Sequence, residues 1–308
     1  MDLGMVGLGR MGANMAERLR LGGHRVVAYD RDPQAVSRTA KNGITGAASL
    51  SGLVAALTPP RAIWVMVPAG APVEATLADL GRLLVAGDAV LDGGNSNYRD
   101  TLRRHETLEA AGIHLVDVGT SGGIWGLAEG YSLMIGGDAD VVSRLRPLFE
   151  SLAPAPDRGW GRVGPAGSGH FVKMVHNGIE YGLMQAYAEG FSVLAHKEEF
   201  ALDLHQVSEI WRHGSVVRSW LLDLASDALA ENPRLDGIDP YVVDSGEGRW
   251  TVDEALDLGV PAPAITASLV ARLRSRDRES FADRLLSVLR GRFGGHEVRK
   301  KGPDAQAR

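Results

Sequence analysis

A glycine-rich turn near the start of the chain constrains the fold more than any other feature. It follows a short apolar run at Leu3–Val6 and precedes a helical pattern at Ala13–Leu21. In such a strand–turn–helix unit the first glycine permits the tight turn, the second lets the backbone approach a pyrophosphate, and the third lets helix and strand pack closely. The amides at the start of the helix then face the phosphates. We therefore predict a dinucleotide site at Gly7, Leu8, Gly9, Arg10, Met11 and Gly12.

The end of the next predicted strand, Arg25–Tyr29, indicates which dinucleotide binds. Asp30 follows this strand, 18 residues after Gly12. A carboxylate there accepts hydrogen bonds from the adenosine ribose and repels a 2′-phosphate, which favours NAD over NADP. Arg31 follows directly, so use of NADP stays open, and Arg31 could instead lie against the adenine. The alternative is a purely structural glycine turn with a surface aspartate.

Apolar runs continue to alternate with helical patterns over the first half of the chain. Further strands are predicted at 62–67, 89–91, 113–118 and 131–135, and helices separate most of them. This order is typical of a doubly wound, mostly parallel α/β sheet with right-handed crossovers. We expect a Rossmann-like dinucleotide-binding domain over residues 1–166.

Ligands bind such sheets beyond the carboxyl ends of the strands, where three more loops are expected to lie. The first two supply predicted cofactor contacts at Val67, Pro68, Ala69 and Asn95. The third, 119–123, offers free amides and two hydroxyls, unless it is an ordinary glycine turn.

The second half shows no strand pattern. Helices are predicted from about Phe171 and at 202–211, 219–230, 251–258 and 262–274. We expect an all-helical substrate and dimerisation domain over 167–308, a linker near Gly161–Gly169, and a polar, basic tail from Gly294 whose last ten or so residues are frayed.

The helix that begins near Phe171 carries a polar stripe. The stripe residues are spaced i, i+3, i+4, i+7 and i+8, which places them on one face: Lys173, His176, Asn177, Glu180 and Tyr181. On so apolar a helix they indicate a site, although a solvated face is the alternative. Gly178, Gly182 and Ala186 form a row of small residues. Because each interior glycine costs about 1 kcal/mol relative to alanine, we expect another backbone to approach closely there.

The amino-acid composition argues against several classes of function and of binding site. The net charge of -5 argues against general nucleic-acid binding. The absence of cysteine excludes disulfides, thiolate catalysis and cysteine zinc sites, and it fits a reducing compartment, so we expect a cytoplasmic protein. No membrane-length apolar run or signal peptide is recognised. The nine histidines lack metal-site spacing, and no metal is expected.

Four segments together resemble the decarboxylating 6-phosphogluconate dehydrogenases, over nearly the whole chain. They are Gly4–Met15, Asp92–Ser96, Ser121–Gly123 and, most specifically, His170–Tyr181 (HFVKMVHNGIEY). The length resembles the short branch of this family, which lacks a second helical repeat. The lysine and the asparagine are common to the wider beta-hydroxyacid dehydrogenase superfamily, whereas His176, Glu180 and Tyr181 point to 6-phosphogluconate.

The resemblance implies oxidative decarboxylation of 6-phosphogluconate to ribulose 5-phosphate and carbon dioxide, with reduction of NAD(P). It assigns Lys173 as the general base that takes the C3 hydroxyl proton, and Glu180 as the acid that protonates C1 of the enediol after carbon dioxide departs. The groups that hold the carboxylate and hydroxyls would be Asn95, Ser121, Gly122, Gly123 and the catalytic neighbours His176 and Asn177. Tyr181 and Arg218 would contact the phosphate. Arg290 and His296 would complete the phosphate site of a neighbouring subunit, which implies an obligate homodimer or homotetramer.

Two departures from the family pattern stand out. Longer members bind the phosphate with a lysine and a threonine, where this chain has Ser245 and Glu247; Arg249 is a candidate replacement cation. The Asn-Arg-Thr of NADP-using members is replaced by Tyr29-Asp30-Arg31.

The residues themselves suggest a mechanism without metal. Oxidation of an alcohol beta to a carboxylate gives a 3-keto acid, which loses carbon dioxide once its carbonyl is polarised. Lys173, protonated by the substrate hydroxyl, would supply that positive charge. To act first as a base it needs a pKa well below ~10.4. Two rivals stay open: another beta-hydroxyacid dehydrogenase, acting on gluconate or 3-hydroxyisobutyrate, and a dinucleotide-binding regulatory protein without turnover.

Overall fold

The computed structural model describes residues 1–299 of the 308-residue chain. Its contacts divide the chain into two units. Unit 1 comprises Met1–Ile179 and Glu247–Asp257, and unit 2 comprises Glu180–Gly246 and the described residues from Leu258 onward. The predicted boundary between residues 166 and 167 stays a prediction.

Unit 1 contains one eight-stranded sheet, in the order β3-β2-β1-β4-β5-β6-β7-β8. The strands are β1 (Asp2–Val6), β2 (Arg25–Tyr29), β3 (Thr45–Gly46), β4 (Ala62–Val65), β5 (Ala89–Asp92), β6 (His114–Ser121), β7 (Ser132–Gly136) and β8 (Trp160–Gly164). All neighbours are parallel except β6 and β7. Val6 pairs with Tyr29 and with Val65, so three strands end at the same edge. The predicted doubly wound, mostly parallel sheet is confirmed.

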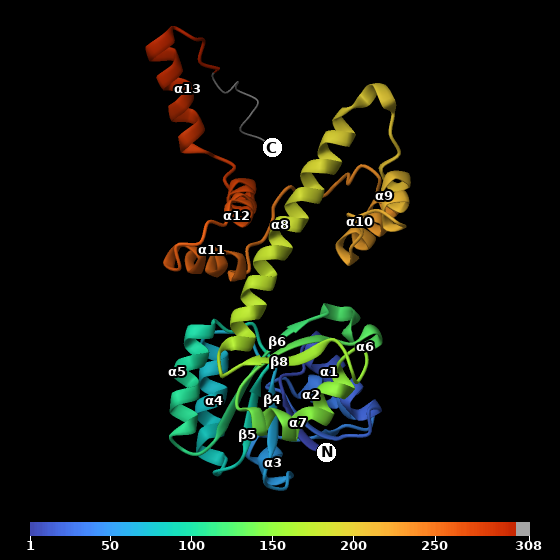
Figure 1. Ribbon diagram of the computed structural model, residues 1–308, viewed down its shortest axis with the longest axis vertical. Coiled ribbons are helices and arrows are strands. Elements are labelled where there is room, and N and C mark those ends of the chain that lie inside the picture. Colours follow the sequence, from blue (N-terminus) through green and yellow to red (C-terminus); the bar gives the residue numbers. More distant parts are fainter. Residues whose placement is uncertain (300–308) are drawn as a thin grey trace. The chain divides into compact units, whose positions relative to one another are not determined.

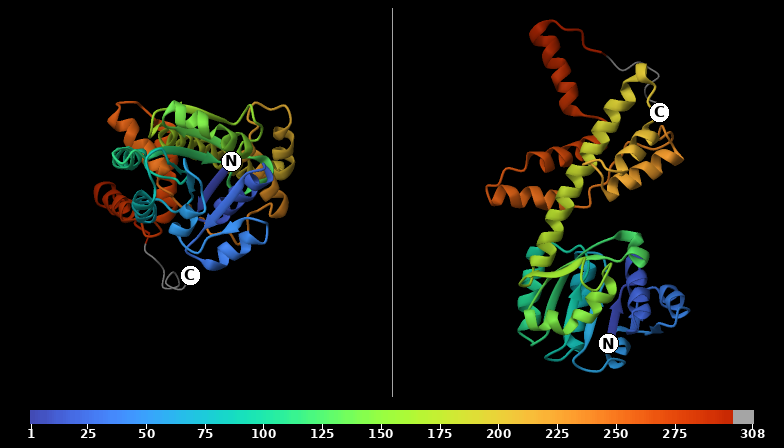
Figure 2. Two further views of the ribbon diagram at one scale, coloured as in Figure 1. Left: turned by 90° about the horizontal axis from the view of Figure 1, so that it is seen from below. Right: turned by 45° about the vertical axis from the view of Figure 1, so that its right-hand side comes forward.

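Helices cover both faces of this sheet (Figures 1 and 2). They are α1 (Arg10–Leu21), α2 (Pro33–Ala40), α3 (Leu50–Ala55), α4 (Ala71–Leu83), α5 (Tyr98–Glu109), α6 (Gly126–Glu129, after the short η1, Gly123–Trp125) and α7 (Ala139–Leu152). Alternate strand residues point to opposite faces. Met5 and Trp64 accordingly pack in one core with α1, α2 and α7, and Val6 and Val65 in another with α3, α4 and α5.

Parts of the sheet differ from the sequence prediction. The linker predicted at 161–169 is wrong over its first four residues, because Gly161–Gly164 belong to the edge strand β8. The predicted loop at 119–123 is wrong over its first three, because β6 stays paired with β7 as far as Ser121 opposite Ser132. β3 has two residues, too few for a recognisable alternation.

The helical part of the chain follows β8. Its helices are α8 (Ser168–His196), η2 (Glu198–Phe200), α9 (Leu204–Arg212), α10 (Trp220–Glu231), α11 (Glu247–Asp257), α12 (Pro263–Arg276) and α13 (Phe281–Gly294). The predicted all-helical region is confirmed, with α13 as an addition. The predicted frayed end lies, except for Arg299, outside the described residues. Among residues 1–299, no helix has the length and apolarity needed to cross a membrane.

Candidate active site

The glycine turn between β1 and α1 has the geometry that its sequence requires. Gly7 adopts φ +94°, and a Cβ there would lie 2.8 Å from the carbonyl carbon of Met66. A Cβ at Gly12 would press against the Gly7 carbonyl, whereas at Gly9 no described atom lies within 4 Å. Gly9 is also the N-cap of α1 and offers no side-chain cap. The turn therefore leaves open space in front of uncapped helix amides, which fits the pyrophosphate of a dinucleotide.

Asp30 links the end of β2 to this turn. Its Oδ2 accepts a hydrogen bond from the Leu8 amide at 2.6 Å, and its Oδ1 accepts one from the Asp32 amide at 2.8 Å. Asp30 is half-buried and Arg31 is exposed. A carboxylate offers about four acceptor positions, so these two bonds leave room for ribose hydroxyls.

The loop after β5 is held by a buried aspartate that the sequence analysis did not single out. Asp92 is 1% exposed and accepts hydrogen bonds from the Gly94 amide (3.1 Å), Ser96 Oγ (2.7 Å) and Arg104 (3.3 Å). These bonds fix the segment that carries Asn95, whose own side chain is exposed. After β4, Val67 is half-buried, and Pro68 and Ala69 are exposed.

A second buried carboxylate anchors the start of α8 to the sheet. Asp117, on β6, accepts hydrogen bonds from the amides of Gly167 (2.7 Å) and His170 (2.8 Å). Its negative charge also suits the positive end of the helix. The His170 ring donates through Nε2 to the Asp92 carbonyl (3.1 Å), and its Nδ1 lies 2.7 Å from Thr101 Oγ1. The first turn of α8 is thus tied to β5, β6 and α5.

Two glycines allow α8 to lie directly on β6 and β7. A Cβ at Gly169 would be 2.5 Å from the carbonyl oxygens of Asp117 and Met134. A Cβ at Gly119 would be 2.6 Å from the Gly169 oxygen and would collide with the Lys173 side chain. This close packing places Lys173 against the carboxyl-terminal half of β6.

Three members of the predicted polar stripe meet in unit 1. Lys173 is 7% exposed, and its Nζ lies 3.4 Å from His176 Nδ1, which in turn lies 3.0 Å from Asn177 Oδ1. Asn177 is also buried. The stripe is therefore not a solvated face over these residues. Glu180, half-buried, and Tyr181 follow on the same helix and belong to unit 2.

The row of small residues on α8 is explained differently from the prediction. A Cβ at Gly178 would lie 2.7 Å from the Thr251 side chain of α11, not from another backbone. Thr251 Oγ1 donates to the Met174 carbonyl at 2.8 Å, so a side chain accounts for this glycine. At Gly182 no described atom lies within 4 Å. The expected close approach of a backbone is thus wrong for the described residues.

The turn after β6 has positive φ angles that favour glycine at two positions. Gly122 and Gly123 have φ values of +136° and +51°, a range in which other residues are strained. Ser121 and Gly122 are half-buried and Gly123 is exposed. Their predicted contacts with substrate stay predictions.

In unit 2, Tyr181 is the centre of a polar cluster. Its hydroxyl lies 3.0 Å from Ser245 Oγ, accepts a hydrogen bond from the Ser245 amide (3.2 Å), and lies 3.5 Å from Asp244 Oδ1. The Arg272 guanidinium stacks on the Tyr181 ring, 3.5 Å from its centroid. The sequence analysis missed Arg272, because no local spacing connects a residue on α12 with one on α8.

Ser245 and Glu247, the two positions that depart from the family pattern, lie in different elements of the structure. Ser245 stays in the loop beside Tyr181, whereas Glu247 opens α11, where it is 4% exposed. Among the described residues, Glu247 Oε2 has no hydrogen-bond partner. Arg249 is exposed on α11.

The remaining predicted phosphate residues are exposed. Arg218 precedes α10, Arg290 lies on α13, and His296 follows α13. Their roles stay predictions.

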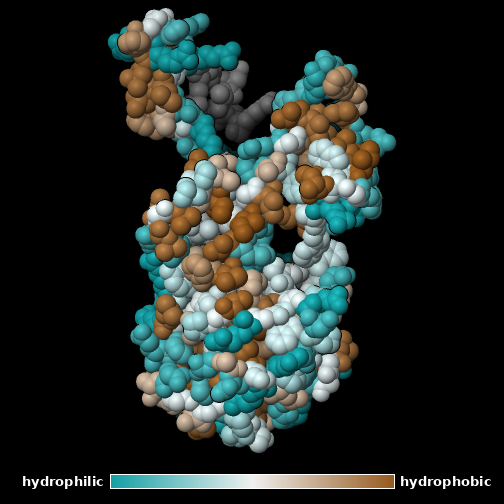
Figure 3. Space-filling model, in the orientation of Figure 1, coloured by the Kyte–Doolittle hydropathy of each residue, from teal (hydrophilic) through white to brown (hydrophobic). Residues whose placement is uncertain are grey.

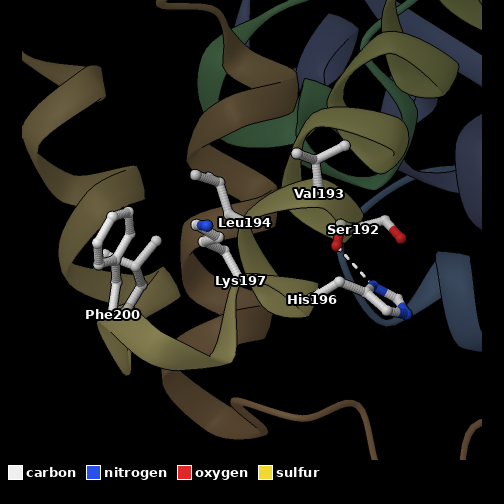
Figure 4. Close-up of a pocket in the computed structure, with 7 residues that line it drawn as sticks. Ser192, Val193, Leu194, His196, Lys197 and Phe200 are labelled. Carbon is white, nitrogen blue, oxygen red and sulfur yellow. Dashed lines mark hydrogen bonds between the residues drawn. The ribbon is translucent and has the colours of Figure 1, made fainter.

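Two other features lie apart from the predicted residues. A hollow of about 420 Å³ near the end of α8 is lined by Ser192, Val193, Leu194, His196, Lys197, Phe200 and Leu202 (Figure 4). In unit 1, Glu109, His114 and Asp138 bring possible metal ligands within 4.8 Å of one another, near the amino end of β6. That edge is opposite to the one that carries the glycine turn, so this cluster is not part of the candidate site.

Comparisons with known proteins agree with this geometry. Residues 2–161 match the family model of the NAD binding domain of 6-phosphogluconate dehydrogenase, and residues 169–292 match that of its C-terminal domain. The chain is 47% identical over 302 residues to the NAD(+)-dependent, decarboxylating 6-phosphogluconate dehydrogenase of Haloferax volcanii, covering 98% of this chain and 99% of the relative.

Similar solved structures include two dehydrogenases. Plasmodium falciparum 6-phosphogluconate dehydrogenase, described with NADP+ and with 6-phosphogluconate, has a TM-score of 0.84 and 28% identity over 99% of this chain and 67% of its own. Mycobacterium tuberculosis 3-hydroxyisobutyrate dehydrogenase has a TM-score of 0.70 and 25% identity, over 87% of this chain and 90% of its own. The chain therefore belongs to the 6-phosphogluconate dehydrogenase family.

Proposed function

We propose that this chain oxidises and decarboxylates 6-phospho-D-gluconate to ribulose 5-phosphate and carbon dioxide, with NAD as oxidant. The observation that carries the proposal is the buried Lys173, held against β6 and in contact with His176. The glycine turn of the same unit fits a dinucleotide, and the Haloferax relative is named for this reaction with NAD.

The chemistry then divides between the cofactor and the side chains. When bound, the nicotinamide accepts the hydride from C3 of the sugar acid. Lys173 takes the proton of the C3 hydroxyl, and its ammonium then polarises the new 3-keto group. The bond between C1 and C2 breaks as carbon dioxide leaves, and Glu180 gives a proton to the enediol carbon left behind.

The other polar groups orient the substrate in this proposal. His176 and Asn177 lie beside Lys173, and Asn95 is carried by the loop that Asp92 fixes. Ser121, Gly122 and Gly123 supply a hydroxyl and amides for the carboxylate and hydroxyls. These assignments come from the family resemblance.

The preference for NAD rests on Asp30. Its carboxylate is already fixed beside the glycine turn by the Leu8 amide, at the end of β2 where the adenosine ribose lies in such sheets. A 2′-phosphate would meet this negative charge. Exposed Arg31 makes weak use of NADP compatible with the proposal.

In this proposal, residues of unit 2 bind the phosphate group of the substrate. Tyr181 and the stacked Arg272 form its base, with Arg218 as a further cation. The resemblance adds Arg290 and His296 from a neighbouring subunit, so we propose a homodimer or homotetramer. Hydrophobic side chains exposed on α8 and α13 support it, because apolar patches of this kind commonly mark interfaces: Ile179, Leu183, Val193, Leu285, Leu286 and Leu289 (Figure 3). A cytoplasmic location also stays part of the proposal.

Two observations keep a dehydrogenase of an unphosphorylated acid as the second candidate function. Ser245 and Glu247 replace two phosphate-binding residues of the longer family members, and the 3-hydroxyisobutyrate dehydrogenase fold is also similar. That candidate predicts faster turnover of gluconate or 3-hydroxyisobutyrate than of 6-phosphogluconate.

The variants Lys173→Ala and Glu180→Gln test the assigned roles. We expect NAD affinity to stay nearly unchanged while kcat with 6-phosphogluconate falls by at least ~100-fold, the low end for general acid–base groups. Glu189→Gln, exposed on the same helix and hydrogen-bonded to Gln185, is the control and should keep its activity. Near-normal turnover by both site variants would reject the assignment.

A further inference from the structure

Helix α12 brings a second arginine to the cluster around Tyr181. Arg272 and Arg276 are spaced i, i+4, so they lie one above the other on the helix surface. Arg272 stacks on the Tyr181 ring and donates to the Val243 carbonyl at 2.8 Å. Arg276 Nη1 lies 3.9 Å from Asp244 Oδ2. Both guanidinium groups therefore border the loop that carries Ser245.

The charges of this cluster favour an anion. Two like charges at this spacing repel each other and destabilise a helix. Asp244, whose side chain is 4% exposed, lies 3.9 Å from Arg276 and offsets one of the two charges. Arg272, Arg276 and Asp244 together keep one net positive charge, beside the Tyr181 and Ser245 hydroxyls. This positive charge would attract a phosphate group.

The contact between Arg276 and Asp244 includes no hydrogen bond from the guanidinium group. At 3.9 Å the guanidinium and the Asp244 carboxylate attract each other but are too far apart for a hydrogen bond. This contact uses none of the five N–H donors, which match the oxygens of a phosphate in pairs. The Arg276 side chain is 35% exposed, so a ligand can reach it.

We propose that Arg276 is a specificity-determining residue that binds the terminal phosphate of the substrate, in the role left open by Ser245. The proposal rests on the proposed function, because it takes the ligand to be a phosphorylated sugar acid. Arg276 fits this role better than Arg249, since it borders the Tyr181 loop, whereas Arg249 is exposed on α11. Arg274, on the same helix, is instead paired with Asp283.

The test compares Arg276→Gln with Arg274→Gln in the full chain. Hydrogen bonds between charged groups contribute about 1.5–3 kcal/mol, which corresponds to a factor of at least about 10 in affinity. We expect Arg276→Gln to raise the KM for 6-phosphogluconate, and the competitive inhibition constant of inorganic phosphate, by at least that factor with kcat within about threefold. Arg276→Lys, which keeps the charge, should be intermediate, and Arg274→Gln should match the wild type.

The outcomes separate this inference from the proposed function. An unchanged KM and an unchanged phosphate constant in Arg276→Gln would overturn the role of Arg276, as would an equal loss in Arg274→Gln. A fall in kcat together with a lower Tm would show a merely structural role and also overturn it. If the wild type does not turn over 6-phosphogluconate, the proposed function fails. Calorimetric titration of each protein with 6-phosphogluconate would then still test Arg276 by itself.

Discussion

Replacing Gly119 with alanine adds one methyl group where β6 meets α8. The new Cβ would lie 2.6 Å from the Gly169 carbonyl oxygen and 3.2 Å from Lys173 Cγ, and closer still to Lys173 Cβ. Ordinary contact begins near 3.4 Å, so β6 and the first turn of α8 must separate by about 0.8 Å or more. The backbone oxygen cannot rotate away as the end of a long side chain could.

This displacement has two calculable effects. Overpacking of this size typically costs 1–3 kcal/mol, and for a unit of this size each kcal/mol lowers the Tm by about 2–4 °C. The displaced residue is also the proposed base, and a misplacement of about 1 Å can cost on the order of 100-fold in rate. We therefore expect Gly119→Ala to fold, with a lower Tm and a much lower kcat, while NAD binding at the glycine turn between β1 and α1 is kept.

The assay combines thermal unfolding, NAD titration and initial rates with 6-phosphogluconate. Gly161→Ala is the matched control, because this glycine lies in the same sheet, on β8, and a Cβ added to it would have no described atom within 4 Å. Its Tm and kcat should stay close to those of the wild type. A fully active Gly119→Ala protein would refute the inference that close packing of α8 on β6 positions Lys173.

Two further predictions concern buried polar groups of unit 1. Asp117→Asn removes one acceptor from the pair of amides that it caps, so the free energy of unfolding should fall by about 1–3 kcal/mol in denaturant titrations; an unchanged value would show that the cap is unimportant. The Tyr131 hydroxyl is buried without a hydrogen-bond partner among the described residues, so Tyr131→Phe should raise the free energy of unfolding at pH 7 by about 1 kcal/mol. Burial raises the pKa of Tyr131 to about 12, above the unfolded value of ~10, so the native state favours the neutral hydroxyl. The wild type should therefore lose further stability relative to Tyr131→Phe as pH rises from about 10 to 12. Parallel unfolding curves over that range would contradict the burial of this hydroxyl.

The parts of the fold that follow from local sequence were predictable. The glycine turn and the buried strands β1, β2, β4 and β5 are each specified by neighbouring residues, and so is the polar stripe of α8. The helical period alone brought Lys173, His176 and Asn177 onto one face, where the structure places them in contact.

The parts that depend on distant residues were not predictable in this way. Asp117 caps a helix 50 residues later in the chain, and nothing in its own neighbourhood indicates this. The edge strand β8 is glycine-rich and only half-buried, so it lacks the apolar alternation of the central strands. Arg272 on α12 meets Tyr181 on α8 only through the tertiary fold. Such pairings arise from tertiary packing, which overrides local pattern.

Product analysis with 6-phosphogluconate labelled at C1 tests the central claim most directly. If Lys173 takes the C3 hydroxyl proton while NAD accepts the hydride, and then promotes loss of the carboxyl group, each NADH formed should be matched by one labelled carbon dioxide and one ribulose 5-phosphate. Lys173→Ala should abolish both products together. NADH formation without labelled carbon dioxide, or unimpaired release of both by Lys173→Ala, would contradict the claim.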